Sequence, residues 1–188
     1  MARLAPWRLV GDALAVGAGF EAARAAGNEG VVAKDPGSAY APGRRGGAWF
    51  KLKRPLATLD VVVTAVERGH GRRRGVLSDY TFAVRAAADD PRLLVVGKAY
   101  SGLTDAEIAA LTRRFDTLTL EQRGGWHRVR PEVVLEVTFD VVQPSTRHSS
   151  GYALRFPRIV RVRDDKPVSE IDTLARVREL ADGVTTPA

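Results

Sequence analysis

The chain of 188 residues contains no cysteine. This absence excludes disulfide bonds, zinc sites built on thiolates and iron–sulfur clusters, and it fits a reducing compartment. No apolar run is long enough to span a bilayer, and the residues before Phe20 lack the extended apolar region of a secretion signal. We therefore expect a soluble protein of a bacterial-type cytoplasm.

Lysine and histidine are also scarce. Only five of the 29 Lys and Arg residues are lysines, namely Lys34, Lys51, Lys53, Lys98 and Lys166. The three histidines are far apart in the sequence, and we expect them in turns or at strand ends. The pattern therefore does not favour a metal site built from His70, His127 and His148.

Arginine supplies most of the formal net charge of +7 at pH 7, and the isoelectric point is near 10.2. A basic globular domain is a candidate for a polyanionic partner, because Lys and Arg release counterions when they contact phosphates. The charge alone fits a basic surface without a polyanionic partner almost as well. Hydrophobic residues make up 45% of the chain, enough for a packed core, and the length suits one domain plus part of another.

Residues 1–55 are predicted to be the tail of one domain. We expect a short helix over 20–26 that stops at Gly27, a strand over 31–33, a loop over 35–47 and a strand over 49–53. Proline cannot donate to a strand ladder, so Pro55 ends this segment and marks a domain boundary.

Residues 56–188 are predicted to be mainly β. Three strands are expected over 59–67, 76–85 and 93–99, and two more over 133–142 and 153–162. A helix lies between the third and fourth strands, where Thr104 and Glu107 form a capping box ahead of an apolar face made of Ile108, Leu111, Phe115 and Leu118. This order is typical of an OB-fold, a five-stranded barrel that commonly binds nucleic acid. Ser169 is expected to cap a last helix ending near Leu180.

The first motif is Glu-Gly-Val-Val-Ala-Lys, residues 29–34. Glu29 enters a short apolar strand and Lys34 leaves it, so both side chains can face one pocket. A carboxylate suits a hard divalent cation, and an ammonium group suits a phosphate. Taken alone, a strand flanked by solvated charges is the simpler interpretation.

The second motif is Trp-Phe-Lys-Leu-Lys, residues 49–53. The period of two predicts that Lys51 and Lys53 share one face of a strand. Two ammonium groups on one side require anions or water, because like charges repel. A bound phosphate meets that requirement, and so does a half-solvated edge strand.

The third motif covers residues 155–166, where Arg161 and Arg163 alternate along a strand and Lys166 follows its end. Planar guanidinium groups suit phosphate oxygens, although a charged strand end at a barrel rim gives the same pattern. A separate basic turn could grip a phosphate backbone or could simply be solvated; it consists of Arg72, Arg73 and Arg74. Asp140 is expected to be an exposed strand residue.

Together, the order and spacing of the three motifs resemble ATP-dependent DNA ligases, which are covalent nucleotidyltransferases. The segment 29–34 resembles their motif IV, the segment 38–53 their motif V, and the segment 155–166 their motif VI. The resemblance extends from Phe20 to Leu180. It implies a C-terminal fragment of the adenylation domain over 1–55 and an OB-fold domain with a C-terminal helix over 56–188. The motif VI segment fits an mRNA-capping enzyme less well.

The resemblance also implies roles for individual residues. In the family, a lysine attacks the α-phosphate of ATP, AMP passes to the 5′-phosphate of a nick, and the 3′-hydroxyl then displaces AMP. Glu29 would bind Mg²⁺. Contacts to the phosphates of ATP or AMP would come from Arg45 and Lys51, with Lys34 and Lys53 beside them. Arg161, Arg163 and Lys166 would orient the pyrophosphate leaving group, and the barrel would close over nicked or duplex DNA, associating the protein with the nucleoid.

One departure from the family is decisive for the chemistry. The nucleophile is a lysine in a Lys-x-Asp-Gly motif upstream of motif IV, and no lysine of this chain is followed by that pattern. We therefore expect no self-adenylation by this chain alone. Three interpretations follow: a C-terminal part of a full ligase, one half of a split ligase whose N-terminal half carries the lysine, or a stand-alone OB-fold module that binds DNA without chemistry.

Overall fold

The computed structural model describes residues 5–26, 28–39, 41–43, 46–53 and 57–182. These residues fall into two compact units, one within 1–54 and one within 55–185. We call them the N-terminal unit and the barrel unit. The boundary expected at residues 55 and 56 lies outside the described residues. No helix in the described part of the chain has the length and hydropathy needed to cross a membrane.

The N-terminal unit consists of one helix and a two-stranded ribbon. Helix α1 spans Ala13–Ala25, and the antiparallel strands are β1 (Gly30–Lys34) and β2 (Trp49–Lys53). The helix is longer than the predicted 20–26, because the Asp12 side chain caps it by accepting a hydrogen bond from the Ala15 N–H at 2.7 Å. Phe20 is the one buried side chain among the described residues of this unit.

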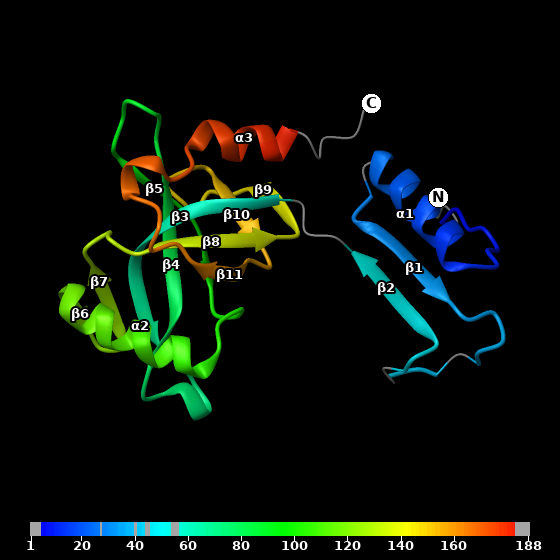
Figure 1. Ribbon diagram of the computed structural model, residues 1–188, viewed down its shortest axis with the longest axis horizontal. Coiled ribbons are helices and arrows are strands. Elements are labelled where there is room, and N and C mark those ends of the chain that lie inside the picture. Colours follow the sequence, from blue (N-terminus) through cyan, green and yellow to red (C-terminus); the bar gives the residue numbers. More distant parts are fainter. Residues whose placement is uncertain (1–4, 27, 40, 44–45, 54–56, 183–188) are drawn as a thin grey trace. The chain divides into compact units, whose positions relative to one another are not determined.

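The barrel unit is built on a strongly curved antiparallel sheet (Figure 1). Its main path runs in the order β11-β8-β3-β4-β5, with bounds Arg158–Val162, Val134–Phe139, Ala57–Arg68, Leu77–Arg85 and Leu93–Ala99. The two ends of this path meet where the Ile159 N–H donates to the Ser101 carbonyl at 2.9 Å. The expected fold class, mainly β with helices, is confirmed.

Two helices cover this barrel, and Figure 1 shows them at opposite ends of it. Helix α2 spans Asp105–Leu118, and helix α3 spans Leu174–Asp182. The predicted capping box of α2 is confirmed, because Thr104 and Glu107 exchange side-chain and backbone hydrogen bonds. Its predicted apolar face is buried: Ile108, Leu111, Phe115 and Leu118.

The second half of the barrel unit has more strands than we predicted. A hairpin was missed: β6 (Thr119–Arg123) and β7 (Trp126–Val129) pair across a Gly124-Gly125 turn, and β7 also pairs with β3. The strand expected over 133–142 divides at Asp140 into β8 and β9 (Val141–Pro144). The strand expected over 153–162 divides into β10 (Tyr152–Arg155) and β11, because Phe156 has φ +52° and Pro157 follows it.

The short helical turns also differ from prediction. Ser169 does not cap the last helix; it lies in the 3-10 turn η2 (Val168–Glu170). The chain then stays extended while Asp172 exchanges hydrogen bonds with Asp60, and α3 begins only at Leu174. The basic turn after β3 contains a second 3-10 turn, η1 (Gly71–Arg73).

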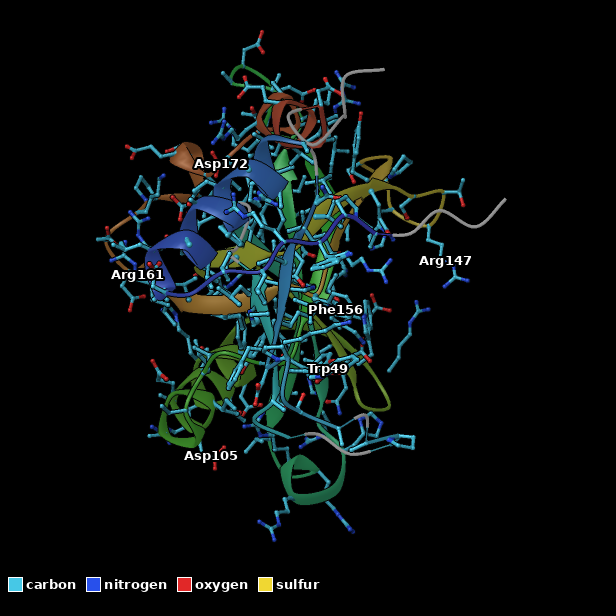
Figure 2. All side chains as sticks on the ribbon, turned by 90° about the vertical axis from the view of Figure 1, so that its right-hand side faces the viewer. Trp49, Asp105, Arg147, Phe156, Arg161 and Asp172 are labelled. Atoms are coloured by element: carbon cyan, nitrogen blue, oxygen red, sulfur yellow. The ribbon has the colours of Figure 1, made fainter. Side chains whose placement is uncertain are left out.

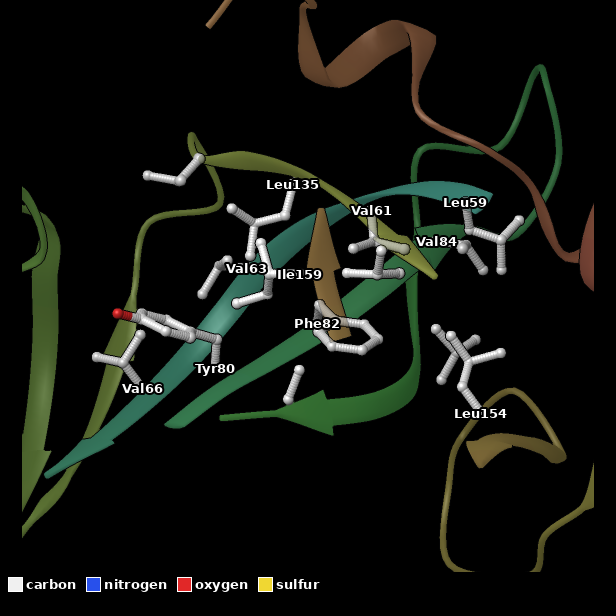
Figure 3. Close-up of a cluster of buried hydrophobic side chains, with 14 of the residues drawn as sticks. Leu59, Val61, Val63, Val66, Tyr80, Phe82, Val84, Leu135, Leu154 and Ile159 are labelled. Atoms are coloured by element: carbon white, nitrogen blue, oxygen red, sulfur yellow. The ribbon is translucent and has the colours of Figure 1, made fainter. Parts of the chain in front are cut away.

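The core of the barrel unit is formed by alternate side chains of its strands. Figure 3 shows Leu59, Val61 and Val63 of β3 facing the same cluster as Tyr80 and Phe82 of β4. Each fully buried side chain of this size contributes about 1.5–3 kcal/mol of hydrophobic stabilisation. The Tyr80 hydroxyl donates to the Leu77 carbonyl at 2.8 Å, so its polar atom stays satisfied inside the core.

The meeting point of the two sheet ends depends on a glycine. Gly102 has φ +111°, and a Cβ at this position would lie 1.9 Å from the Ile159 carbonyl oxygen. We expect Gly102→Ala to lower the free energy of unfolding by about 2 kcal/mol or more, through backbone strain and this clash. Urea unfolding measures the change, with Gly75→Ala as control, because a Cβ there meets nothing within 4 Å. Equal stability of the two variants would contradict this account of barrel closure.

Candidate nucleotide-phosphate site and nucleic-acid surface

The ribbon of the N-terminal unit gathers three lysines on one face. Residues directly opposite each other in an antiparallel pair share a face, and the register pairs Lys34 with Trp49, Val32 with Lys51, and Gly30 with Lys53. Lys51 and Lys53 therefore lie on one face, as their spacing predicted, and Lys34 joins them there. A cationic face of this kind suits phosphate oxygens.

The three lysines differ in their partners. Lys53 forms an ion pair with Glu29, with its Nζ 2.8 Å from Oε2. The Lys34 ammonium lies 4.1 Å from the centre of the Trp49 ring, a cation–π contact. Lys51 is exposed and, within the described residues, has no carboxylate partner. Arg45, also predicted to contact phosphates, lies outside the described residues.

Glu29 is the predicted metal ligand. The described residues contain no group of three or more His, Asp or Glu side chains able to hold a metal ion together. Mg²⁺ does not need such a group, because one or two carboxylates suffice when waters and substrate phosphates complete its coordination shell. The Glu29 carboxylate is half-exposed beside the lysine face, so it fits this minimal role once its pairing with Lys53 is loosened.

On the barrel unit, Asp60 of β3 brings two of the predicted cations together. Both Asp60 carboxylate oxygens lie 3.0 Å from one terminal nitrogen of Arg163, and Oδ2 also accepts from Lys166 Nζ at 2.6 Å. The Asp60 side chain is only 12% exposed. Asp60 was not predicted as a site residue; its one signal in the sequence is a charge within the apolar run 59–63.

The remaining donors of the third motif also meet carboxylates. Arg163 presents its Nε and its other terminal nitrogen to Asp165, and Arg161 Nε donates to Glu136 across the β8–β11 pair at 2.7 Å. These bonds hold the pKa of Glu136 and of Asp165 below their usual values and raise that of Arg163. The predicted cations are thus present at the barrel surface, but carboxylates of the barrel itself engage them.

Asp172 holds the backbone of this cluster in place at Asp60. Its carboxylate accepts a hydrogen bond from the Asp60 N–H at 2.8 Å, and its own N–H donates to the Asp60 carbonyl at 2.9 Å. Burial raises the pKa of Asp172, and the nearby negative charge of Asp60 adds to that effect. The backbone of Asp60 is therefore held at a defined position.

The basic turn is anchored at its middle residue. Arg73 donates to the Tyr100 carbonyl and, at 3.1 Å, to Asp105 at the start of α2. Its neighbours Arg72 and Arg74 are exposed. The structure thus separates the three predicted DNA contacts into one arginine bound within the barrel unit and two that face solvent.

Two exposed aromatic residues of the barrel unit were not identified from the sequence, and one of them, Tyr100, lies beside this turn. Tyr100 and Phe156 are 66% and 57% exposed. They line a hollow of about 340 Å³ together with Arg158, and Tyr100 also lines a second hollow of about 330 Å³ with His70 and Arg73. Figure 2 labels Phe156, whose ring lies 5.1 Å from the Arg155 guanidinium. Aromatic and cationic groups side by side suit bases and phosphates.

Two minor expectations were wrong. His127 lies within β7 and is buried, because it packs where β7 pairs with β3. Its Nε2 has no hydrogen-bond partner among the described residues. The Asp140 side chain is largely buried rather than exposed, since it forms an ion pair with Arg158 at 3.3 Å.

The sequence matches two family models. Residues 2–53 match the model described as ATP dependent DNA ligase domain, and residues 73–166 match ATP dependent DNA ligase C terminal region. The ligase domain of LigD from M. tuberculosis superposes with a TM-score of 0.53 at 27% identity, covering 81% of this chain and 50% of that one. The solved protein Pmar-Lig_PreS3 shares the fold, with a TM-score of 0.62 at 23% identity over 80% of this chain and 30% of that one.

Curated relatives agree with these matches. A probable DNA ligase of Opitutus terrae is 61% identical over 178 residues, which are 95% of this chain and 18% of that protein. A probable DNA ligase of Koribacter versatilis is 60% identical over 161 residues, or 86% of this chain and 27% of that protein. The chain thus spans less than a third of the length of either relative. It belongs to the ATP-dependent DNA ligase family and corresponds to the C-terminal part of its members.

Proposed function

We propose that this chain supplies the C-terminal part of a nick-sealing ligase, in which the barrel binds nicked duplex DNA and both units contribute cations to the phosphates of ATP. The observation that carries the proposal is the clustering of Arg161, Arg163 and Lys166 at one barrel surface, in a family whose substrate is a nucleoside triphosphate. Guanidinium and ammonium groups are the usual donors to phosphate oxygens.

The lysine face supports a contact with the same nucleotide. Lys51 is exposed and is not neutralised by a carboxylate of the described residues, so it is available to an α-phosphate. Lys34 and Lys53 extend the positive surface on either side of it. Glu29 would hold Mg²⁺, which offsets phosphate charge when it is bound.

The nucleophile must come from elsewhere, because none of the five lysines lies in a Lys-x-Asp-Gly motif. The N-terminal unit is suited to meeting further protein. Within it, Phe20 alone is buried among the described residues, whereas Trp7, Val32 and Phe50 are exposed. An N-terminal ligase segment bearing the lysine, in the same polypeptide or in a separate one, would bury these apolar groups and complete the adenylation site.

DNA contact is assigned to the barrel. Arg72, Arg74, Tyr100 and Phe156 all project from it, and the chain carries a net charge of +7. Contacts of this type position a protein on the phosphate backbone without reading base sequence. The barrel has a complete hydrophobic core of its own, which also favours a second candidate function, a DNA-binding module without chemistry.

We expect salt-sensitive, sequence-independent binding to nicked duplex DNA, with a dissociation constant of about 10⁻⁴ to 10⁻⁶ M at physiological salt. Arg72→Ala/Arg74→Ala should reduce the slope of log K against log salt by about two, since two phosphate contacts are lost. Fluorescence anisotropy at several salt concentrations measures this slope. Arg92→Ala/Arg176→Ala, which removes the same charge from two arginines paired with Asp90 and Glu179, is the matched control. Equal slopes in the two double variants would assign the basic turn to an ordinary solvated surface.

We also expect no covalent AMP on this chain after incubation with ATP and Mg²⁺, because the nucleophilic lysine motif is absent. Intact-protein mass spectrometry detects the adduct. Adding a polypeptide that carries the missing ligase segment should produce an AMP adduct on that polypeptide and allow a nick to be sealed. An adduct on any lysine of this chain alone would refute the proposal. Failure of every such polypeptide to restore sealing would leave the DNA-binding module as the function.

A further inference from the structure

Two cations of the third motif, Arg163 and Lys166, are largely buried and already paired with carboxylates in the free barrel. Each nitrogen of the Arg163 side chain that can donate already faces a carboxylate: Nε and one terminal nitrogen face Asp165, and the other terminal nitrogen faces Asp60. Lys166 donates to Asp60 as well. A polyphosphate that takes over the hydrogen bonds which Arg163 now makes to these carboxylates must displace them, because both ligands would use the same hydrogens.

The two carboxylates are not equivalent. Asp165 is 62% exposed and, among the described residues, its side chain pairs with Arg163 alone, so water competes with it directly. Asp60 is 12% exposed and contacts both Arg163 and Lys166. The Asp60 carboxylate is the acceptor that both cations now share, so a phosphate that bridges them through the same hydrogen bonds must take its place.

We propose that Asp60 is an internal counter-ion that occupies the polyphosphate site of the free barrel and competes with the polyphosphate for Arg163 and Lys166. The proposal rests on the proposed function, which assigns those two cations to ATP or pyrophosphate. The Asp60 carboxylate also offsets the mutual repulsion of the two cations, each of which has a nitrogen within 3.0 Å of it.

The backbone around Asp60 explains why this competitor stays in place. Asp60 lies in β3, and two hydrogen bonds to Asp172 hold its N–H and its carbonyl. The carboxylate is therefore presented without any loop having to become ordered. Its competition weakens the retention of polyphosphate by the barrel, which favours departure of a polyphosphate product once it has formed.

Isothermal titration with inorganic pyrophosphate tests the proposal on the full chain. Asp60→Asn keeps the side-chain shape and removes the charge, so pyrophosphate should bind about tenfold more tightly than to the wild type. Asp90→Asn is the matched control, because it changes the net charge by the same amount at a pair with Arg92 outside the third motif. We expect its affinity to stay within about twofold of the wild type, since Asp90 pairs with Arg92 and not with Arg163 or Lys166. Equal or weaker binding by Asp60→Asn than by Asp90→Asn would overturn the proposal.

A double variant separates this proposal from the proposed function. In Asp60→Asn/Arg163→Ala the gain in pyrophosphate affinity should disappear, because the variant lacks the guanidinium group that Asp60→Asn makes available. A gain that survives the loss of Arg163 would show that pyrophosphate binds elsewhere, which overturns the assignment of Arg163 and with it the counter-ion role. Binding that depends on Arg163 but does not gain from Asp60→Asn would overturn the counter-ion role alone.

A measurement on the wild type gives a result even if the variants do not fold. Carbon-13 NMR of the Asp60 carboxyl group reports whether its cations leave. Saturating pyrophosphate should shift this resonance together with the side-chain Nε resonance of Arg163. A shift at Arg163 with an unchanged Asp60 carboxyl would mean that pyrophosphate displaces Asp165 only, and the proposal would be wrong.

Discussion

The contact between Ile159 and Ser101 closes the barrel, and much of the surface chemistry depends on it. The Ile159 N–H reaches the Ser101 carbonyl because Gly102 has no side chain to keep the two segments apart. This contact joins the start of β11 to the chain just after β5. Since β11 carries Arg161 and leads directly to Arg163, the position of the charged cluster follows from a close approach of two backbones.

The sequence predicts the structure correctly where the determinants are local. The capping box of α2 needs only Thr104 and Glu107, and the bounds of β2 follow from alternation over Trp49–Lys53. The prediction was wrong where contacts between distant segments determine the structure. Ser169 has a good capping side chain, but the segment after it pairs with Asp60 instead of starting a helix. The Gly124-Gly125 turn of the missed hairpin was a local signal that could have been used.

The site residues show the same difference between local and distant determinants. A period of two was enough to place Lys51 and Lys53 on one face, whereas no spacing rule could place Asp60 beside Arg163, which lies 103 positions further along the chain. Exposed aromatic residues were missed for a related reason. Phe156 stands in a run that reads as one continuous strand, and only the positive φ at this residue and the following proline turn it away from the core.

The anchoring of the basic turn has a consequence for how it meets a ligand. Arg73 is held by the Tyr100 carbonyl and by Asp105, so the backbone between β3 and β4 is attached at its centre to the first turn of α2. Arg72 and Arg74 therefore project from a backbone that is already ordered. Ordering a flexible segment costs about 1–2 kcal/mol per residue in conformational entropy. A short turn braced in this way loses little backbone freedom on association, so the entropy cost of binding through Arg72 and Arg74 falls mainly on their own side chains.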